Sequence, residues 1–433
     1  MQSESERLEI PVAAAPSLEI AVPGSKSLTN RALLVSALAE GRSRLEGALV
    51  AEDTDVMKRA LLDLGFTVEG EGDKVEVEGL GGKIPSREAR LDLRLSGTSI
   101  RFLAALVALG KGRFELDGNT RMRERPIGDL LMALNALGAN AVAMEGNDCP
   151  PLIVEAGGLT GGRAEVAGDR SSQYLSALLM VAPYAHSETV LEVTGELQSK
   201  PFIDMTLDLM ADFGVEVRRK GYRRFTVPTG GYAARNYRIE GDAMAAGYFW
   251  AAAAVTGGRV RVTNLGRASR QGDRRLAEVL EAMGCTVAWG EEWSEVRGPA
   301  GGKLRGGSFD LNDMPDQAQT LAAVALFANA PVEITNVWNL RIKETDRLLA
   351  LANELRKFGA QVEERRDGLM IEPPQRLVPA VVETYGDHRM AMAFAVAGLR
   401  VPGTEILDPG CVAKTYPGFF DDFRSLASGG PAL

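Results

Sequence analysis

The sequence predicts an α/β protein of two globular domains, each made of three βαβαββ units. Its 433 residues are too many for one hydrophobic core, and 45% hydrophobic with 25% charged residues is typical of globular proteins. Helix-like segments that end at a glycine recur along the chain at nearly constant spacing. A second series of more apolar segments recurs in phase with the first.

The first series consists of amphipathic segments with an apolar residue immediately before a glycine. The glycines are Gly65, Gly138, Gly214, Gly284 and Gly359. Their separations are 73, 76, 70 and 75 residues, and FFDDFRSLASGG (419–430) fits as a degenerate sixth copy. A glycine in the left-handed conformation ends such a helix, and an apolar position three residues later indicates that a strand follows directly.

The second series consists of six Ala- and Leu-rich segments that are too apolar to be anything but buried helices. Five of them open with a Gly, Ser or Asp residue suited to N-capping, and in the other Asp316 follows an opening proline. The segments are 24–39, 96–110, 169–182, 241–255, 315–328 and 386–399. A chance recurrence of common Leu-Gly turns is the alternative, and six in-phase pairs argue against it.

Short apolar segments between the helices complete the repeat. RVRVTNL (259–265), TEILDP (404–409) and SRLEGAL (43–49) are typical of strands. The simplest unit consistent with this order is βαβαββ, repeated three times in each domain.

Charge and composition exclude several classes of protein. A net charge of -9 and a pI near 5.2 disfavour non-specific binding to nucleic acid. The N-terminal residues do not resemble a signal peptide, and the apolar run Ala243–Val255 is well short of the roughly 20 residues that span a bilayer. Cys149, Cys285 and Cys411 are few and far apart, which predicts neither a disulfide framework nor a metal site. We therefore expect a cytoplasmic protein.

Polar residues gather where the buried helices are expected to begin. Helix N-termini offer unpaired N–H groups and a partial positive charge, so several N-termini facing one cleft would bind a strongly anionic substrate. Any one of these residues alone is an ordinary cap, but together they exceed what capping needs. They are Lys26, Ser27, Arg31, Gly97, Thr98, Ser171, Ser172, Gln173, Asp316, Asp387, His388 and Arg389.

Nine motifs, in order along nearly the whole chain, resemble those of the 3-phosphoshikimate 1-carboxyvinyltransferases, or EPSP synthases. The motifs are PGSKSLTNRALL (23–34), LSGTSIRFLAAL (95–106), RMRERPIGDL (121–130), GDRSSQYLSALL (168–179), SKPFIDMTL (199–207), MPDQAQT (314–320), RIKETDRL (341–348), YGDHRMAMAF (385–394) and LDPGCVAKTYP (407–417).

The resemblance implies an inside-out α/β barrel with a pseudo-sixfold repeat. An N-terminal domain, 20–240, would bind shikimate 3-phosphate. A C-terminal domain, 1–19 plus 241–433, would bind phosphoenolpyruvate and carry the catalytic carboxylates. The active site would be the cleft between the domains, which close around the substrates. The resemblance implies no metal and no organic cofactor, and we expect a monomer.

The resemblance also assigns the site residues. Shikimate 3-phosphate would contact Lys26, Ser27, Arg31, Ser171, Ser172, Gln173, Ser199, Asp316, Asn339 and Lys343. Phosphoenolpyruvate would contact Lys26, Gly97, Arg125, Gln173, Arg347, Asp387, His388, Arg389 and Lys414. Arginine suits these anions because its planar fork binds carboxylate and phosphate bidentately.

The implied reaction needs two opposite proton transfers, since the 5-hydroxyl loses a proton as it attacks C2 of phosphoenolpyruvate and C3 gains one. Asp316 would contact the hydroxyl, Glu344 would protonate C3, and Lys26 would bridge both substrates. Which carboxylate is acid and which is base stays open, because neighbouring cations lower a carboxylate pKa. The alternative for Lys343, Glu344 and Asp346 is a solvated charge cluster, and for Asp387 and His388 a capped pair.

Four positions depart from the commoner family pattern. They are Arg94 in place of a Gly just before the second motif, Leu95 in place of an Asn within it, Phe102 in place of a Pro, and Phe202 in place of a Tyr. Gly97 is retained, and the resemblance implies that glyphosate mimics phosphoenolpyruvate beside it. We therefore expect glyphosate to inhibit this protein.

Three other functions share part of this pattern. The sister transferase that acts on UDP-N-acetylglucosamine uses a cysteine in the loop before RPIG, where this chain has DGNTRMRE (117–124). A non-catalytic anion-binding protein of the same fold would have lost Lys26, Asp316 or Glu344. A nucleic-acid 3′-phosphate cyclase is disfavoured by the acidic pI. Cys411 is near Lys414 in sequence, but a structural thiol is the simpler interpretation.

Overall fold

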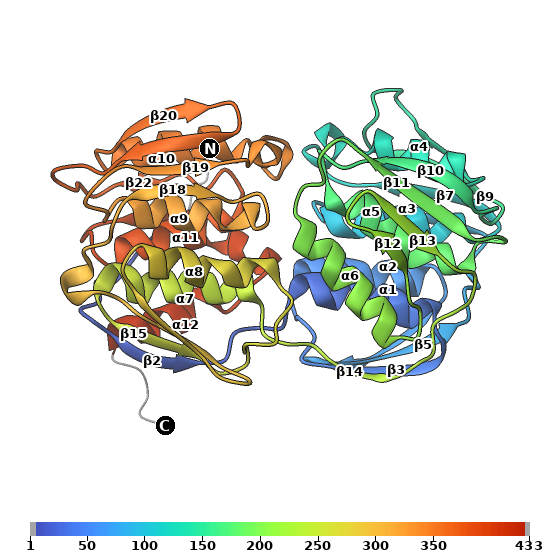
Figure 1. Ribbon diagram of the computed structural model, residues 1–433, viewed down its shortest axis with the longest axis horizontal. Coiled ribbons are helices and arrows are strands. Elements are labelled where there is room, and N and C mark those ends of the chain that lie inside the picture. Colours follow the sequence, from blue (N-terminus) through green and yellow to red (C-terminus); the bar gives the residue numbers. More distant parts are fainter. Residues whose placement is uncertain (1–5, 429–433) are drawn as a thin grey trace. The chain divides into compact units, whose positions relative to one another are not determined.

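Six small β-sheets organise the chain. In the computed structural model, which describes residues 6–428, five sheets have four strands and one has three. The contacts divide the chain into two units (Figure 1). Unit A is Gly24–Ile239, and unit B is the described residues up to Pro23 together with those from Glu240 onward. Each unit contains three of the sheets, and the predicted mixed α/β class is confirmed.

The elements of unit A follow one another as strand and helix in alternation, with a hairpin at the end of each repeat. They are α1 (Lys26–Leu38), β3 (Glu40–Glu46), α2 (Glu52–Asp63), β4 (Thr67–Glu71), β5 (Lys74–Leu80), β6 (Glu88–Asp92), α3 (Gly97–Ala108), β7 (Gly112–Asp117), α4 (Gly128–Ala136), β8 (Asn140–Ala143), β9 (Leu152–Ala156), β10 (Gly162–Ala167), α5 (Ser172–Val181), β11 (Thr189–Thr194), α6 (Lys200–Asp212), β12 (Arg218–Lys220), β13 (Arg224–Val227) and β14 (Asn236–Arg238).

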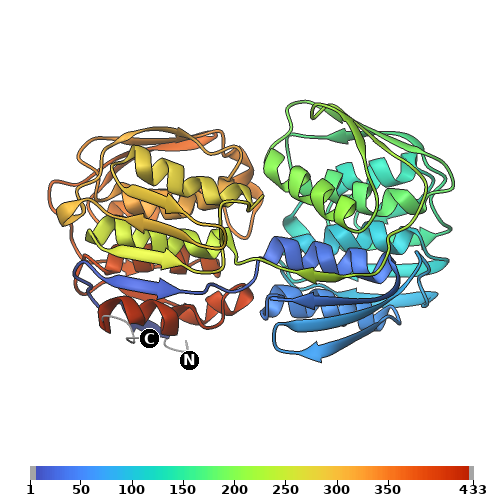
Figure 2. The same ribbon diagram turned by 60° about the horizontal axis from the view of Figure 1, so that its bottom comes forward.

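Each four-stranded sheet has the same pairing pattern. In the sheet β6-β7-β9-β8, β6 is parallel to β7, while β9 is antiparallel to both β7 and β8. The sheet β10-β11-β13-β12 repeats this arrangement. In the sheet β14-β3-β5-β4 the strand parallel to β3 is β14, which comes from the far end of the unit. The last strand of unit A therefore completes its first sheet (Figure 2).

Unit B is built in the same way. Its elements are β1 (Arg7–Glu9), β2 (Ser17–Ile20), α7 (Ala243–Thr256), β15 (Arg259–Val262), α8 (Leu276–Ala282), β16 (Thr286–Trp289), β17 (Ser294–Arg297), β18 (Gly307–Asp310), α9 (Ala318–Ala325), β19 (Val332–Thr335), α10 (Arg347–Lys357), β20 (Gln361–Arg365), β21 (Gly368–Glu372), β22 (Val381–Val382), α11 (His388–Gly398), β23 (Glu405–Leu407) and α12 (Phe419–Ser428).

The N-terminal strands complete two sheets of unit B. β2 lies parallel to β15, with Ser17 opposite Arg259, in the sheet β16-β17-β15-β2. β1 lies antiparallel to β23 in the three-stranded sheet β1-β23-β22. The remaining sheet, β18-β19-β21-β20, is drawn from continuous sequence.

The glycines of the first repeat end their helices as predicted. Gly65, Gly138, Gly214, Gly284 and Gly359 all have φ between 88° and 110°, in the left-handed region that favours glycine. A strand begins two residues later in four of the five cases, and four residues later, at Arg218, in the fifth. The sixth copy forms α12, while the glycines expected to end it lie outside the described residues.

The second repeat forms the buried helices, which lie between the sheets of each unit (Figures 1 and 2). Every residue of α7 and of α3 is buried, α9 and α11 pack together in unit B, and α3 and α5 pack together in unit A. The sheets turn one face to solvent, as in β5, where Val75 and Val77 are buried and alternate residues are not. Each unit thus has its own apolar core.

Side-chain capping of these helices is less regular than predicted. Ser25, Ser171, Asp242 and Asp387 accept hydrogen bonds from N–H groups of the first turn. Ser96, before α3, bonds the hydroxyl of Ser99 instead. The remaining buried helix, α9, has no side-chain cap because the 3₁₀ turn η5 (Pro315–Gln317) leads directly into it.

Two further sequence expectations concern the membrane and the cysteines. No helix among residues 6–428 is long and apolar enough to cross a bilayer. Cys149, Cys285 and Cys411 are free. Burial raises the pKa of Cys411 to about 12, so it is a thiol rather than a reactive thiolate at neutral pH.

A buried carboxylate fixes the loop that leads into α11. Glu354 on α10 is fully buried, and it accepts hydrogen bonds from the Tyr385 hydroxyl at 2.8 Å and the Glu383 amide at 3.0 Å. Lys357 pairs with the same carboxylate at 2.7 Å. Tyr385 has φ of 57°, which is unfavourable for a bulky residue. Burial, and then the bond to Glu354, raise the pKa of its hydroxyl to about 12. The bond to Glu354 therefore holds the strained turn before Asp387.

We predict that Tyr385→Phe lowers the free energy of unfolding by about 1–3 kcal/mol, because an oxygen of the buried Glu354 loses its donor. Urea unfolding measures this loss. Tyr222→Phe is the matched control, since its hydroxyl donates at 2.6 Å to the partly exposed Asp204, which water can solvate. A loss no larger in Tyr385→Phe than in the control would show that the bond does not hold the turn.

Candidate active site

Unit B holds a buried cluster of ion pairs centred on Arg347, the first residue of α10. The Arg347 side chain is 1% exposed. Its Nε donates to Asp387 Oδ2 at 2.7 Å, its Nη1 to Asp316 Oδ1 at 2.9 Å, and its Nη2 to Glu344 Oε2 at 2.9 Å. One guanidinium therefore joins the turn before α9, the start of α10 and the N-cap of α11.

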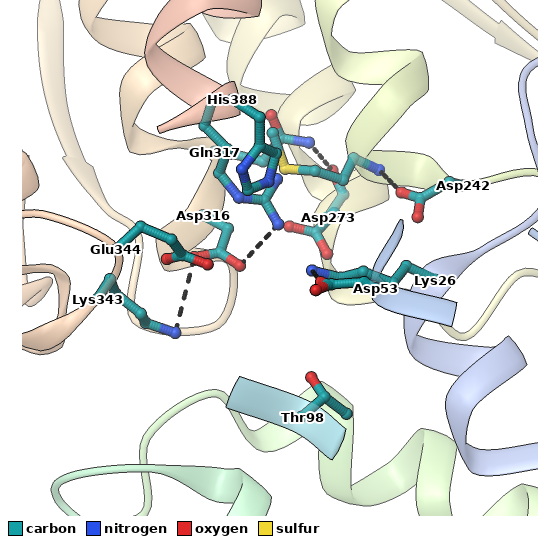
Figure 3. Close-up of polar contacts among 12 residues, drawn as sticks. Lys26, Asp53, Thr98, Asp242, Asp273, Asp316, Gln317, Lys343, Glu344 and His388 are labelled. Atoms are coloured by element: carbon teal, nitrogen blue, oxygen red, sulfur yellow. Dashed lines mark hydrogen bonds and ion pairs between the residues drawn. The ribbon is translucent and has the colours of Figure 1, made fainter. Parts of the chain in front are cut away.

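Asp316 lies among three cations (Figure 3). Besides Arg347, it accepts from Arg389 Nη2 at 3.0 Å and pairs with Lys343 Nζ at 3.8 Å. Burial alone would raise the pKa of Asp316, but the charges of Arg389, Lys343 and Arg347 outweigh it and hold that pKa well below its usual range. Asp316 is therefore ionised at every physiological pH.

Glu344 bridges two cations. It accepts from Arg347 and from Lys414 Nζ, at the end of the 3₁₀ segment η7 (Pro409–Lys414), and its side chain is 8% exposed. That burial does not fit a solvated charge cluster. Asp346, in contrast, is 34% exposed; it pairs with Arg341 and caps α10.

Three other expected residues of unit B lie in or beside this cluster. Asp387 caps α11 by accepting from the Arg389 amide at 3.0 Å, and His388 is fully buried with Nδ1 3.5 Å from Asp387 Oδ1. Asn339, in the 3₁₀ segment η6 (Trp338–Ile342), is buried, and its Oδ1 has no hydrogen-bond partner among the described residues.

Unit A places Lys26 at the first residue of α1. Its Nζ pairs with Asp53 Oδ2 at 3.1 Å, and both side chains are largely buried (Figure 3). Asp53 was not predicted as a site residue. Its position in α2 gives no signal in the sequence, because the contact arises only from the packing of α2 on α1.

Arg31, one turn further along α1, is buried without an ion-pair partner among the described residues. Its donors bond the hydroxyls of Thr206 at 2.8 Å and Ser176 at 3.1 Å and the Ser27 carbonyl at 3.0 Å. The rings of Phe102 and Phe202 lie 5.2 and 5.9 Å from its guanidinium carbon. Burial lowers the pKa of Arg31 to about 9, so it remains charged at neutral pH. Two of the residues that depart from the family pattern therefore pack against this cation.

The starts of α3 and α5 meet around Gln173. Its Oε1 accepts from Arg101 Nη1 at 2.8 Å, and its Nε2 donates to Thr98 Oγ1 at 3.2 Å. Arg101 was missed by the sequence reasoning. Its place four residues after Gly97 was the available signal, because residues at i and i+4 share a helix face, and its Nη1 indeed bonds the Gly97 carbonyl at 3.0 Å.

Gly97 leaves room for two guanidinium groups. A Cβ atom there would lie 2.7 Å from Arg101 Nη1 and 2.7 Å from Arg125 Nη2. Arg125 is buried at the end of the 3₁₀ turn η1 (Met122–Glu124). The next carbonyl, of Pro126, accepts from the Tyr174 hydroxyl at 2.6 Å. Any side chain at position 97 would therefore crowd both arginines.

The expected serines all lie at helix starts. Ser171 caps α5 by accepting from the Gln173 amide at 3.3 Å, and Ser172 is the first residue of that helix. Ser199 precedes α6 with φ of 55° and is buried. Ser27 is half-buried in the first turn of α1.

The cluster around Arg347 in unit B and the polar residues at the helix starts of unit A are both suited to binding anions. Cations outnumber carboxylates in each, with Lys343, Arg347, Arg389 and Lys414 around three carboxylates in unit B. Unit A gathers Lys26, Arg31, Arg101 and Arg125, of which Lys26 pairs with Asp53. Within the part of the chain that the structure describes, no group of three or more His, Cys, Asp or Glu side chains could hold a metal ion.

Comparisons with known proteins agree on one family. The family model described as EPSP synthase (3-phosphoshikimate 1-carboxyvinyltransferase) matches residues 14–423. Curated relatives with the name 3-phosphoshikimate 1-carboxyvinyltransferase include one from Nostoc punctiforme, 51% identical over 97% of this chain and 99% of the relative. Another, from Shewanella oneidensis, is 48% identical over 94% of this chain and 96% of the relative.

A solved structure of EPSP synthase from Acinetobacter baumannii has a TM-score of 0.80 and 26% sequence identity. It covers 97% of this chain and 98% of its own. With sequence identity near 50% over almost the full length and the same fold, the chain belongs to the EPSP synthase (3-phosphoshikimate 1-carboxyvinyltransferase) family.

Proposed function

We propose that the side chains of unit A and unit B described above act together in the reaction that family membership assigns to the chain. The chain is a 3-phosphoshikimate 1-carboxyvinyltransferase of the shikimate pathway. It transfers the enolpyruvyl group of phosphoenolpyruvate to the 5-hydroxyl of shikimate 3-phosphate and releases phosphate. What we add is the role of each residue.

Shikimate 3-phosphate is assigned mainly to unit A. Ser171, Ser172 and Ser199 offer hydroxyl donors at helix starts, where the N-terminal dipole favours a phosphate. Arg31 supplies a charge that no carboxylate of the described chain neutralises. Its buried setting, with Phe102 and Phe202 packed against it, supports a role in holding an anionic group of shikimate 3-phosphate. The other residues of unit A that contact shikimate 3-phosphate are Lys26, Ser27 and Gln173. Those of unit B are Asp316, Asn339 and Lys343.

Phosphoenolpyruvate is assigned to the arginines. Arg347 and Arg389 in unit B and Arg125 in unit A supply three forks for its carboxylate and phosphate groups. Lys26, Lys414 and Gln173 add single donors, and Asp387 and His388 hold the start of α11 from which Arg389 projects. Gly97 keeps the space beside Arg125 open.

Asp316 and Glu344 are proposed as the proton carriers. In the structure, cations make Asp316 a very weak base. When an anionic substrate occupies Arg347 and Arg389, it neutralises those charges, and the pKa of Asp316 rises. The substrate also takes over the donors that Glu344 holds, so Glu344 takes up a proton from solvent before the reaction. Asp316 then accepts the 5-hydroxyl proton while Glu344 gives its proton to C3, producing a tetrahedral intermediate. Loss of phosphate and of a C3 proton completes the transfer.

Several finer features are also proposals. The inner helices with sheets around them support an inside-out α/β barrel in each unit with a pseudo-sixfold repeat. We propose that the active site is the cleft between the domains 20–240 and 1–19 plus 241–433, that substrates bring about closure, and that the protein is a cytoplasmic monomer.

The single observation that carries these assignments is the buried junction of Arg347 with Asp316, Glu344 and Asp387. It is tested by phosphate release from phosphoenolpyruvate with shikimate 3-phosphate, with UDP-N-acetylglucosamine, and with no acceptor. Release with shikimate 3-phosphate alone is the expected result. Release with the UDP-sugar alone would refute the proposal and show that the protein transfers enolpyruvyl to UDP-N-acetylglucosamine instead.

We predict that Asp316→Asn and Glu344→Gln each lower kcat about 100- to 10,000-fold, the range for loss of general acid–base catalysis. The KM for phosphoenolpyruvate should not rise, because removing a negative charge beside Arg347 favours an anion. Asp313→Asn is the matched control, since Asp313 is a partly exposed carboxylate paired with Arg275. Steady-state kinetics that show equal losses in the control would refute the assignment.

Gly97→Ala should raise the KM for phosphoenolpyruvate and weaken inhibition by glyphosate, because its Cβ displaces Arg101 and Arg125. We expect glyphosate to compete with phosphoenolpyruvate in the unmodified protein. Gly157→Ala is the control, since a Cβ there meets nothing within 4 Å. Inhibition that does not depend on phosphoenolpyruvate concentration would contradict this expectation.

A further inference from the structure

Asp273 is a buried carboxylate beside the cluster around Arg347, and no step proposed above uses it. It lies in the 3₁₀ turn η3 (Gly272–Arg275), which leads into α8 and packs on α7. The residue is 5% exposed, and its Oδ1 has no hydrogen-bond partner among the described residues. A buried carboxylate with an oxygen that lacks a hydrogen-bond partner is costly to keep ionised, so its presence calls for a reason.

The position of Asp273 is fixed by the same turn that carries Asp316. Gln317 follows Asp316 directly, and its Nε2 donates to the Asp273 carbonyl at 3.4 Å and the Ala243 carbonyl at 3.3 Å. In the close-up, the Asp273 carboxylate belongs to the same group of side chains as Asp316 (Figure 3). The hydrogen bond from Gln317 to the Asp273 carbonyl therefore keeps Asp273 beside the turn that carries Asp316.

Four charged groups act on Asp273, each from a different element. They are Asp316 before α9, Arg389 on α11, Asp242 at the N-cap of α7, and Lys343 after η6. Asp242 is engaged by the Met244 and Ala245 amides. Arg389 is hydrogen-bonded to Asp316, and the charge of Asp273 also acts on its guanidinium from nearby.

The balance of these effects places the titration of Asp273 near neutral pH. Burial, and then repulsion by Asp316, raise its pKa to about 7, although Arg389 opposes the shift. Asp316 remains ionised at the same pH. One of the two carboxylates beside Arg389 thus changes its charge in the physiological range while the other does not.

We propose that Asp273 is a positioning residue that sets how strongly Arg389 binds the anionic groups of phosphoenolpyruvate. Protonated Asp273 leaves the Arg389 guanidinium available to the substrate. Ionised Asp273 offsets part of the positive charge of that guanidinium and adds a negative charge that repels the substrate. The inference rests on the proposed role of Arg389 in binding phosphoenolpyruvate.

The test compares the unmodified protein with Asp273→Asn, which mimics the protonated side chain. In the unmodified protein, the KM for phosphoenolpyruvate should rise about tenfold or more between pH 6.5 and 8.5. In Asp273→Asn it should change less than about twofold, with kcat at pH 6.5 largely retained. A merely structural role would lower stability or kcat without removing the pH dependence of KM.

Glu240→Gln is the matched control. Glu240 is a nearby, partly buried carboxylate whose pKa is also raised by burial, but it accepts hydrogen bonds from Ser269 and Gln271, and the charges that act on it most are those of Asp242 and Arg274 rather than Arg389. This variant should keep the pH-dependent rise in KM. A loss of that rise in Glu240→Gln as well would overturn the assignment to Asp273.

A second measurement needs no substrate. The folded-state pKa of about 7 lies above the unfolded value near 4, so the folded state of the unmodified protein loses stability relative to Asp273→Asn as pH rises from about 4 to 7. The excess Tm of Asp273→Asn should therefore grow over this window and stay constant above it. A constant difference would overturn the raised pKa on which the inference depends.

The outcomes separate the two proposals. No phosphate release by the unmodified protein would refute the proposed function. An active protein whose KM for phosphoenolpyruvate is constant from pH 6.5 to 8.5 would overturn the role of Asp273, whether or not the variant folds. A pH-dependent KM that persists in Asp273→Asn would overturn it equally.

Discussion

The Arg347 guanidinium is the interaction on which unit B depends. It is almost completely buried, yet it is satisfied by carboxylates from three different positions along the chain. Buried ion pairs often contribute little net stability, because desolvation offsets the attraction. Removing one partner, however, leaves an uncompensated charge and costs about 3–5 kcal/mol. Arg347 therefore specifies how the starts of α9, α10 and α11 meet, more than it stabilises the fold.

The repeat explains why such a junction can form. Four of the six buried helices, α3, α5, α9 and α11, follow a strand that pairs in parallel with the strand after the helix, as β18 before α9 pairs with β19. This arrangement returns the chain to the same edge of the unit, so helix starts recur there. Two sheets take this preceding strand from elsewhere, with β14 beside β3 and β2 beside β15. The pairing pattern is thus preserved even where the chain order is not.

The sequence predicted what depends on local chemistry. Glycine at the end of each amphipathic helix was predictable because only glycine adopts a φ near 90° without strain, and Gly284 and Gly359 do so. The apolar helices were predictable because α7 has no polar face to expose. Polar residues at helix starts, such as Asp387, could be placed because the beginning of each apolar segment marks where the helix begins. The borrowed strands β2 and β14 could not be derived from the repeat alone, because their partners are more than 190 residues away.

Site residues whose role comes from tertiary packing were missed. Asp53 is one of several acidic residues at the start of α2, and only the packing of that helix on α1 selects it for Lys26. Asp273 carries no signal, since its significance lies in an oxygen that the fold leaves without a partner. Arg101 could have been predicted, because it lies four residues after Gly97 and so shares a face of the helix with it. Motif comparison alone does not use this spacing.

Charge compensation links the fold to the chemistry. Without substrate, cations at the site would repel one another if they were not interleaved with carboxylates, and Asp316, Glu344 and Asp387 supply this interleaving in unit B. The same pairing suppresses the basicity of Asp316, so a carboxylate that must accept a proton is inactive until something displaces its partners. An anionic substrate does so by taking over the guanidinium donors. Binding and activation then share one cause: the charge that the substrate neutralises is the charge that held the base in its unreactive form.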